Sequence, residues 1–251
     1  MIKQLNKILK RFGLAFYSKK SIKYTPTSEL SKMHNLDEYD VSYIRGKLDV
    51  GLKEKLLSEH KTKWLEVGCG GNFEDNFYYI DTFPENAVKN KNRYFRADIV
   101  NLTEAQIEKI GKFDFVRMQH VFEHFTPEQG FRVLKNISKI LNDDGYLLIS
   151  TPDLKRFAHL YLSGKINENF KWAHNRIEKE SPDSFYFSIF THSILTEKHE
   201  WCYDFKGLEY QLDKTNKFKN IEEITLQHEL ANIPFTHNRP DQDVCVLAQR
   251  K

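Results

Sequence analysis

The feature that most constrains this chain is a regular alternation of short apolar segments and helical patterns between residues 63 and 153. Five of the segments have the length and the apolar character of strands. They are residues 63–67, 77–81, 94–98, 113–118 and 146–150. Strands that alternate with helices, several of them continuously apolar, indicate a parallel sheet covered on both faces.

Two helices between these strands carry clear starting signals. Residues 103–106 form a capping-box pattern ahead of a helix that Gly111 would end. Residues 126–129 combine a second capping box with a proline at the first helical position, and an apolar face follows. Residues 142–145 predict a turn, and closing strands are expected at residues 224–228 and 244–248.

Composition excludes several classes of protein. A chain of 251 residues with 40% hydrophobic and 14% aromatic residues is long enough to bury a core and is not intrinsically disordered. The formal net charge of +3 comes from 38 basic and 35 acidic residues, and no basic face interleaved with aromatics points to nucleic acid. Three widely spaced cysteines form no disulfide framework and suit a reducing cytoplasm.

The first residues predict a basic amphipathic helix. Apolar residues fall at helical spacing over residues 2–16, with lysines between them. These lysines interrupt any apolar core of a secretory signal. We prefer a helix packed on the body of the domain, and the alternative is a helix lying on an anionic membrane surface.

Glycines and carboxylates follow the first three strands. The glycines at 68, 70 and 71 come directly after a buried strand, where they allow a sharp turn and the close approach of a ligand. Asp81 and Asp98 end the next two strands, at the same edge of the expected sheet. Carboxylates placed in this way hold a nucleoside in such folds. Phe73 stands where a dinucleotide motif would have its third glycine, so a nucleoside without a pyrophosphate is expected.

The order of these motifs resembles class I S-adenosylmethionine-dependent methyltransferases. The resemblance begins at residues 65–72 and continues through Asp81, Asp98 and residues 113–125 to residues 141–153. A Gly-Cys-Gly-Gly-Asn turn, a Thr-Pro-Asp-Leu sequence and a later His-x-Trp-x-Tyr-Asp resemble small bacterial methyltransferases associated with surface-glycan biosynthesis.

The resemblance implies S-adenosylmethionine as cofactor and a role for each matching residue. The glycine loop would meet the methionine moiety, with Glu66 orienting its ammonium. Asp81 would take the ribose hydroxyls, Asp98 and Ile99 the adenine, and Gln119 and His120 the region near the sulfonium. The implied cofactor-binding residues are Glu66, Gly68, Cys69, Gly70, Gly71, Asn72, Asp81, Thr82, Asp98, Ile99, Gln119 and His120.

The fold that the resemblance implies is a Rossmann-like three-layer α/β sandwich. Its sheet would be mostly parallel and seven-stranded, with the last strand antiparallel. Only ten residues separate Gly70 from Asp81, so the first helix after the glycine loop must be shortened or missing. We expect a single domain over residues 1–251. Its parts would be a helical extension (1–45), a cofactor-binding core (46–153), an irregular acceptor-binding lid (154–223) and closing strands (224–251).

Candidate catalytic residues follow the fourth and fifth strands. His199 is the candidate general base or acceptor-binding group, and His124 and Asp153 are further candidates. Glu123 and His124 have an alternative reading as a buried polar cluster that organises the loop. The spacing of His192, His199, Glu200 and Asp204 matches no zinc motif, so no metal is expected. Trp172, Phe185, Trp201 and Tyr203 form either the core of a lid or an acceptor platform.

These observations predict methyl transfer to an oxygen or nitrogen of a small acceptor in the cytoplasm. The acceptor would be a sugar, a sugar nucleotide or a precursor of capsule or lipopolysaccharide. One alternative is a methyltransferase acting on a protein, a lipid or a secondary metabolite. A second is a catalytically silent methyltransferase fold that serves as a binding subunit.

Overall fold

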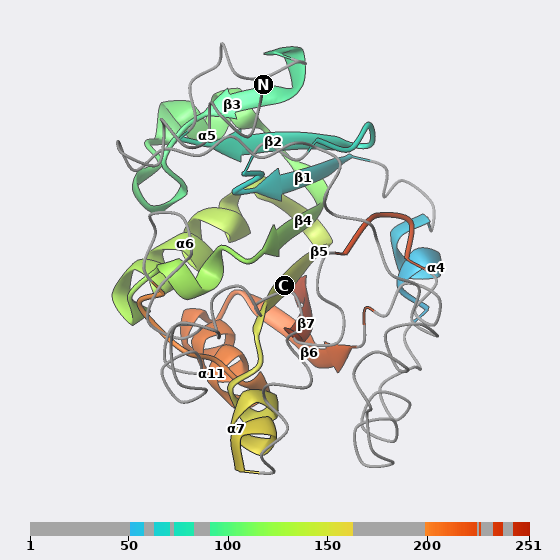
Figure 1. Ribbon diagram of the computed structural model, residues 1–251. Coiled ribbons are helices and arrows are strands. Elements are labelled where there is room, and N and C mark those ends of the chain that lie inside the picture. The colour runs from blue at the N-terminus through green and yellow to red at the C-terminus, as the bar shows by residue number, and fades with distance from the viewer. Residues whose placement is uncertain are drawn as a thin grey trace, which may run out of the picture.

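The computed structural model describes residues 51–57, 63–70, 73–82, 91–162, 199–224, 226, 233–237 and 243–251. In this part of the chain a seven-stranded sheet lies between two layers. Helices α5, α6 and α11 cover one face, and helix α4 with the segment 233–237 lies against the other (Figure 1).

The sheet has the strand order β3-β2-β1-β4-β5-β7-β6. Strands β1 to β5 pair in parallel, whereas β7 runs antiparallel to both of its neighbours. The strands are β1 (Trp64–Val67), β2 (Phe77–Asp81), β3 (Tyr94–Arg96), β4 (Phe113–Gln119), β5 (Leu141–Pro152), β6 (Phe218–Ile224) and β7 (Asp243–Arg250). The predicted mostly parallel sheet with an antiparallel last strand is confirmed.

The helices start where their capping residues place them. Thr103 and Thr126 each accept a hydrogen bond from the backbone N–H three residues later. The Gln106 and Gln129 side chains in turn accept one from the backbone N–H of these threonines. Both predicted capping boxes are therefore confirmed. The helices are α4 (Leu52–Leu57), α5 (Glu104–Ile110), α6 (Pro127–Ile140), α7 (Leu154–Leu162) and α11 (Phe205–Thr215). Single turns of 3-10 helix occur at η3 (Lys91–Arg93), η4 (Ile99–Asn101) and η5 (Phe122–His124).

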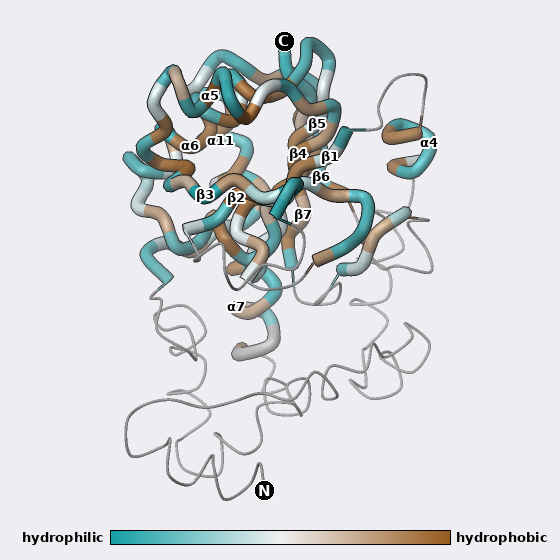
Figure 2. The backbone as a smooth tube through the Cα atoms, turned by 90° about the horizontal axis from the view of Figure 1, so that it is seen from above, coloured by the Kyte–Doolittle hydropathy of each residue, from teal (hydrophilic) through white to brown (hydrophobic). Residues whose placement is uncertain are grey.

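One face of the sheet is closed by helices in the expected way. Leu134 and Ile137 of α6 and Leu208 and Leu212 of α11 are fully buried against it. Apolar residues concentrate where β1, β4 and β5 pass through the middle of the molecule (Figure 2). This burial of an apolar helical stripe is the main stabilising contribution on this side.

On the other face of the sheet, no helix among the described residues lies between the glycine turn and β2. Residues 73–76, which lead into β2, contain no helix. Phe235, only 3% exposed, covers the sheet instead, with its ring centroid 6.0 Å from that of Phe77 and 5.6 Å from that of Phe115. Residues 233–237, from the connection between β6 and β7, thus fill part of the space left by the shortened chain.

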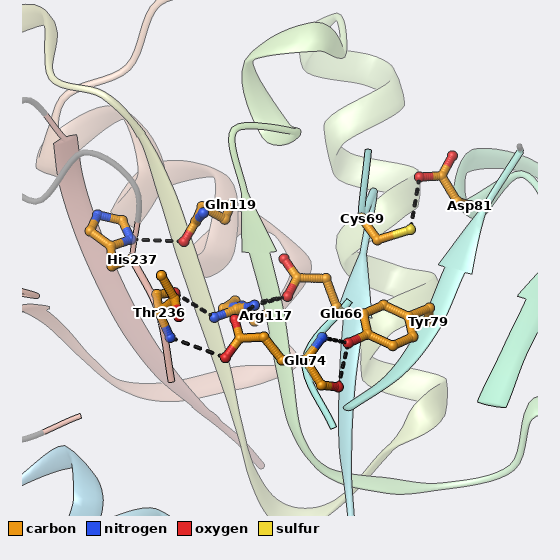
Figure 3. A network of polar contacts seen from close by, with 9 residues as sticks. All are labelled: Glu66, Cys69, Glu74, Tyr79, Asp81, Arg117, Gln119, Thr236 and His237. Atoms are coloured by element: carbon orange, nitrogen blue, oxygen red, sulfur yellow. Dashed lines mark hydrogen bonds and ion pairs between the residues drawn. The ribbon is translucent and has the colours of Figure 1, made fainter. Parts of the chain in front are cut away.

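A buried guanidinium completes this face. The register places Glu66 of β1 beside Arg117 of β4, and the Arg117 Nε donates to Glu66 Oε2 over 2.6 Å. Arg117 also contacts Glu74 Oε1 at 2.8 Å and donates to the carbonyl oxygen of Thr236 over 2.9 Å (Figure 3). The guanidinium of Arg117 therefore joins β1, the turn before β2 and the segment 233–237 through charge-assisted hydrogen bonds.

The environment of this ion pair shifts its ionisation. Burial raises the pKa of Glu66 from 4.5 to about 7, although the charge of Arg117 acts in the opposite direction. The pKa of Arg117 is raised by the two carboxylates despite its burial. The folded protein therefore binds a proton at Glu66 more tightly than the unfolded chain does.

Several predicted boundaries are wrong. The expected turn at 142–145 is part of β5, because pairing with β4 continues across an irregularity in register near Phe113. Strand β6 lies at Phe218–Ile224, where a charged sequence is tolerated at the edge of the sheet. Of the strand predicted at 224–228, residues 225, 227 and 228 lie outside the described residues. The third strand ends at Arg96 and not at residue 98.

The predicted irregular structure of the lid is wrong over residues 154–162 and 205–223. Helix α7 occupies the first stretch, and helix α11 and strand β6 occupy the second and contribute to the core, with Asp204 as the N-cap of α11. The helix predicted for residues 2–16 lies outside the described residues. None of the described helices has the length and apolar character needed to cross a membrane.

Replacing Phe235 with alanine tests whether residues 233–237 stabilise the face of the sheet that they cover. We expect Phe235→Ala to lower the free energy of unfolding by about 3–5 kcal/mol, because the mutation removes a buried aromatic ring that packs against Phe77 and Phe115. The control Tyr210→Ala, at a side chain in α11 that is 64% exposed, should change it by less than about 0.5 kcal/mol. Urea unfolding measures both values, and equal small losses would contradict the assigned packing.

Replacing Glu66 with glutamine tests the buried ion pair through pH. Because the folded-state pKa of Glu66 is about 7 and its ordinary value is 4.5, its stabilising contribution should fall as pH rises between these values. The free energy of unfolding of the native protein, relative to Glu66→Gln, should decrease by at most about 3 kcal/mol over this range. Urea unfolding at several pH values checks this, and a relative stability that rises with pH would refute the shift.

Candidate active site

The glycine turn after β1 has the backbone that only glycine adopts readily. Gly68 has φ 72° and Gly70 has φ 52°. A Cβ atom at Gly68 would lie 2.4 Å from Val121 Cγ2, so the turn passes close to the chain that follows β4. A Cβ at Gly70 would meet nothing within 4 Å, which leaves open space above this residue.

Asp81 at the end of β2 faces this turn. Its Oδ2 accepts from the Gly70 N–H at 3.3 Å and lies 3.6 Å from the sulfur of Cys69, while Thr82 N–H donates to Oδ1 over 2.6 Å. The structure therefore brings together Cys69, Gly70, Asp81 and Thr82. Figure 3 shows the contact between Cys69 and Asp81. The strand order reverses between β1 and β4, and ligands of open α/β sheets bind outside the carboxyl ends at such a point.

The remaining predicted cofactor residues have different surroundings. The Asp98 carboxylate caps η4, accepting from Val100 N over 2.9 Å and Asn101 Nδ2 over 2.7 Å, and Ile99 is part of the core. Glu66 lies below the turn and is engaged by Arg117. Gly71 and Asn72 lie outside the described residues.

Gln119 and His120 belong to a buried network at the end of β4. Gln119 Oε1 lies 2.9 Å from His237 Nδ1, and His120 adopts a left-handed backbone with φ 53°. Asp243 Oδ2 is 2.9 Å from His120 Nε2 and 3.2 Å from His237 Nε2. Asp243 therefore holds two imidazoles that come from different parts of the chain.

This network has unusual ionisation. Burial disfavours the ionised form of Asp243 and would raise its pKa. The interactions with His120 and His237 outweigh this effect and hold the pKa of that carboxyl well below its usual range. Burial lowers the pKa of His237, and Asp243 opposes that shift. Sequence reasoning missed Asp243 and His237, because each is a single polar residue without a surrounding motif.

The candidate catalytic histidines meet beside a buried carboxylate. Glu200 N–H and Trp201 N–H donate to the Glu123 carbonyl oxygen over 2.8 and 3.2 Å, which fixes His199 next to His124. The two imidazole ring centroids are 4.8 Å apart. The predicted residues His124 and His199, distant in sequence, are thus neighbours.

Glu123 lies at the centre of this cluster. It is 2% exposed, and its Oε1 is 3.3 Å from His120 Nδ1. Burial opposes its charge, but the imidazoles of His120, His124 and His199 together lower its pKa. The carboxylate is therefore held ionised among three histidines.

The other acceptor-side candidates are partly structural. Asp153 is buried, and its Oδ1 accepts from the Lys155 N–H over 3.0 Å at the start of α7. A single β-bridge joins Asp153 to Tyr203, whose ring packs 5.2 Å from that of Phe122 in the core. Trp201 is 50% exposed. Trp172, Phe185 and His192 lie outside the described residues.

Comparison with known proteins identifies the family. The family model described as a methyltransferase domain matches residues 41–191. A chemotaxis protein methyltransferase from Campylobacter jejuni is 28% identical over 81 residues, which are 32% of this chain and 28% of the relative. The chain thus spans less than a third of the length of the curated relatives it matches.

One solved methyltransferase structure has a similar fold, and a second matches less closely. The plantazolicin methyltransferase BpumL in complex with S-adenosylhomocysteine has a TM-score of 0.50 and 12% identity, over 100% of this chain and 99% of that one. The N-methyltransferase NodS from Bradyrhizobium japonicum has a TM-score of 0.41 and 14% identity, over 89% and 96% of the two chains. Since the family model covers more than half of the sequence, the chain belongs to the methyltransferase domain family.

Proposed function

We propose that this chain transfers a methyl group from S-adenosylmethionine to an oxygen or nitrogen of a small acceptor. The observation that carries the proposal is the glycine turn at the carboxyl edge, with the Asp81 carboxylate against Gly70 in a chain of the methyltransferase family. The open space at Gly70 fits a ligand that approaches the backbone closely. Asp81 supplies acceptor oxygens of the kind that ribose hydroxyls require.

Each predicted residue has a proposed part in holding the cofactor. The turn contacts the methionine end, Asp81 and Thr82 the ribose, and Asp98 with Ile99 the adenine. Glu66 acts on the ammonium group from below the turn, and Gln119 and His120 border the methionine end near β4. When bound, S-adenosylmethionine supplies a methyl group already activated on a sulfonium. The protein therefore contributes mainly alignment and exclusion of water.

The acceptor side of the proposed site is the cluster of His124, His199 and the buried Glu123. His124 and His199 are half-buried, so they reach the surface of the site beside the buried Glu123. They would contact the reacting group of the acceptor. Asp153 is a weaker candidate for this role, because its carboxylate already accepts from the backbone at the start of α7.

The proposed acceptor is a sugar, a sugar nucleotide or a capsule or lipopolysaccharide precursor. Support comes from the Thr-Pro-Asp-Leu and His-x-Trp-x-Tyr-Asp sequences at 151–154 and 199–204, which resemble glycan-associated methyltransferases. A cytoplasmic location fits the three cysteines Cys69, Cys202 and Cys245, which form no disulfide. Calorimetry with S-adenosylhomocysteine, then turnover with a panel of sugar nucleotides, tests this function. Binding without turnover on any acceptor class would favour a silent binding subunit.

Asp81→Asn tests the cofactor site. Loss of a charge-assisted hydrogen bond should weaken S-adenosylhomocysteine binding by about 10- to 100-fold, measured by calorimetry. Asp81 is a cleaner probe than Asp98, because replacing Asp98 also removes the cap of η4. Glu108→Gln, at an exposed position on α5, is the charge-matched control and should bind normally. Native affinity in Asp81→Asn would remove Asp81 from the site.

His199→Ala tests the acceptor side. Turnover should fall by about 10²- to 10⁴-fold, the range for loss of a group that assists proton removal from the acceptor. Affinity for S-adenosylhomocysteine should stay unchanged. His159→Ala, at a half-buried histidine on α7, is the matched control. Turnover equal to that of the native protein, measured with an acceptor that it methylates, would exclude His199 from the acceptor side.

A further inference from the structure

Glu123 is a buried carboxylate that imidazoles surround without a well-aligned hydrogen bond. It is 2% exposed, and within the described residues its ion-pair contact is the one with His120, which does not meet hydrogen-bond geometry. Burial of an ionised carboxylate is costly unless a hydrogen bond, a cation or a metal compensates it. The nearest cationic candidate, His120 Nδ1 at 3.3 Å from Oε1, is itself held by Asp243 through its other nitrogen.

Two further ligand-type side chains converge on the same point. One ligand atom from each of Glu123, His124 and His199 lies within 4.8 Å of the other two. Two imidazoles and one glutamate are a ligand set of catalytic zinc sites, in which a fourth position stays open. Mg²⁺ and Ca²⁺ prefer oxygen ligands throughout, so the two imidazoles favour a transition metal.

The backbone holds this set close to the size that an ion requires. Glu123 and His124 are consecutive in η5, and the hydrogen bonds from residues 200 and 201 to the Glu123 carbonyl hold His199 beside them. Bonds of about 2.0–2.1 Å to a tetrahedral ion place ligand atoms about 3.3 Å apart. Small rotations of the two half-buried imidazoles would close the difference, and their exposure provides a path of entry.

We propose that the chain binds one divalent transition-metal ion, of the Zn²⁺ type, through Glu123, His124 and His199. The ion neutralises the buried carboxylate and leaves a position open for water or for an oxygen of the acceptor. With the ion bound, His124 and His199 would act on the acceptor through the ion and not as free bases, so their loss would still lower turnover. The spacing of acidic and histidine residues around His199 matches no zinc motif, and for that reason the sequence predicts no metal. The proposed ligands come instead from two distant segments, residues 123–124 and residue 199, so no local motif would reveal them. Binding of the ion does not depend on the proposed methyl transfer.

Titration of chelator-treated protein with Zn²⁺ alone tests this site. Calorimetry should detect one ion per chain in the native protein. Loss of an outer-shell partner alone costs about 10- to 100-fold in metal affinity, so His124→Ala and His199→Ala should weaken binding by at least that much. Glu123→Gln should weaken it similarly while keeping the side-chain shape. His159→Ala is the matched histidine control and should bind Zn²⁺ as the native protein does.

Two further measurements keep the result interpretable. Circular dichroism establishes that each variant is folded, and the visible absorption of bound Co²⁺ reports the ligand set in the native protein without any substitution. Equal Zn²⁺ affinity in the native protein and the folded variants would overturn the proposal. A native protein that binds S-adenosylhomocysteine but takes up neither Zn²⁺ nor Co²⁺ would also overturn it, and would leave the methyl-transfer proposal standing.

Discussion

A single buried guanidinium links the chain segments that cover the sheet opposite α5, α6 and α11. Arg117 joins Glu66 on the neighbouring strand, Glu74 in the turn before β2 and the Thr236 carbonyl in a segment more than a hundred residues later. Its charge also lies over the rings of Phe77 and Phe235, at 4.3 and 4.7 Å. Removing one partner of such a buried pair leaves an uncompensated charge, at a cost of about 3–5 kcal/mol. This network therefore specifies where the segment 233–237 docks.

Residues 233–237 also connect the two halves of the proposed site, the glycine turn and the histidine cluster. Thr236 is bound to Arg117 beneath the glycine turn, and the next residue, His237, contacts Gln119 and Asp243. Asp243 in turn holds His120, whose other nitrogen approaches Glu123. Contacts thus run continuously from the proposed cofactor side to the cluster of His124 and His199. Residues 233–237 therefore connect, through His237, Asp243 and His120, to the residues that we assign to the acceptor side.

Local sequence patterns predicted most of the fold, but they could not predict contacts between segments that are distant in the sequence. The capping boxes at Thr103 and Thr126 and the strand at 77–81 depend on neighbouring residues, so the sequence shows them directly. Strand β6 was not predicted over residues 218–223, because its charged sequence is acceptable only at an edge. His124 and His199 were named separately, but their meeting depends on backbone bonds between residues 123 and 200. Asp243 and Arg117 have no local pattern that reveals their partners.

The central claim is that the glycine turn and the histidine cluster face one site, with the donor held on one side and the acceptor on the other. A crystal structure of the protein with S-adenosylhomocysteine tests it most directly. The account predicts ribose hydroxyls within hydrogen-bond distance of the Asp81 carboxylate and a sulfur atom that faces His124 and His199. A ligand bound away from Gly70, or one whose sulfur points away from both histidines, would contradict it.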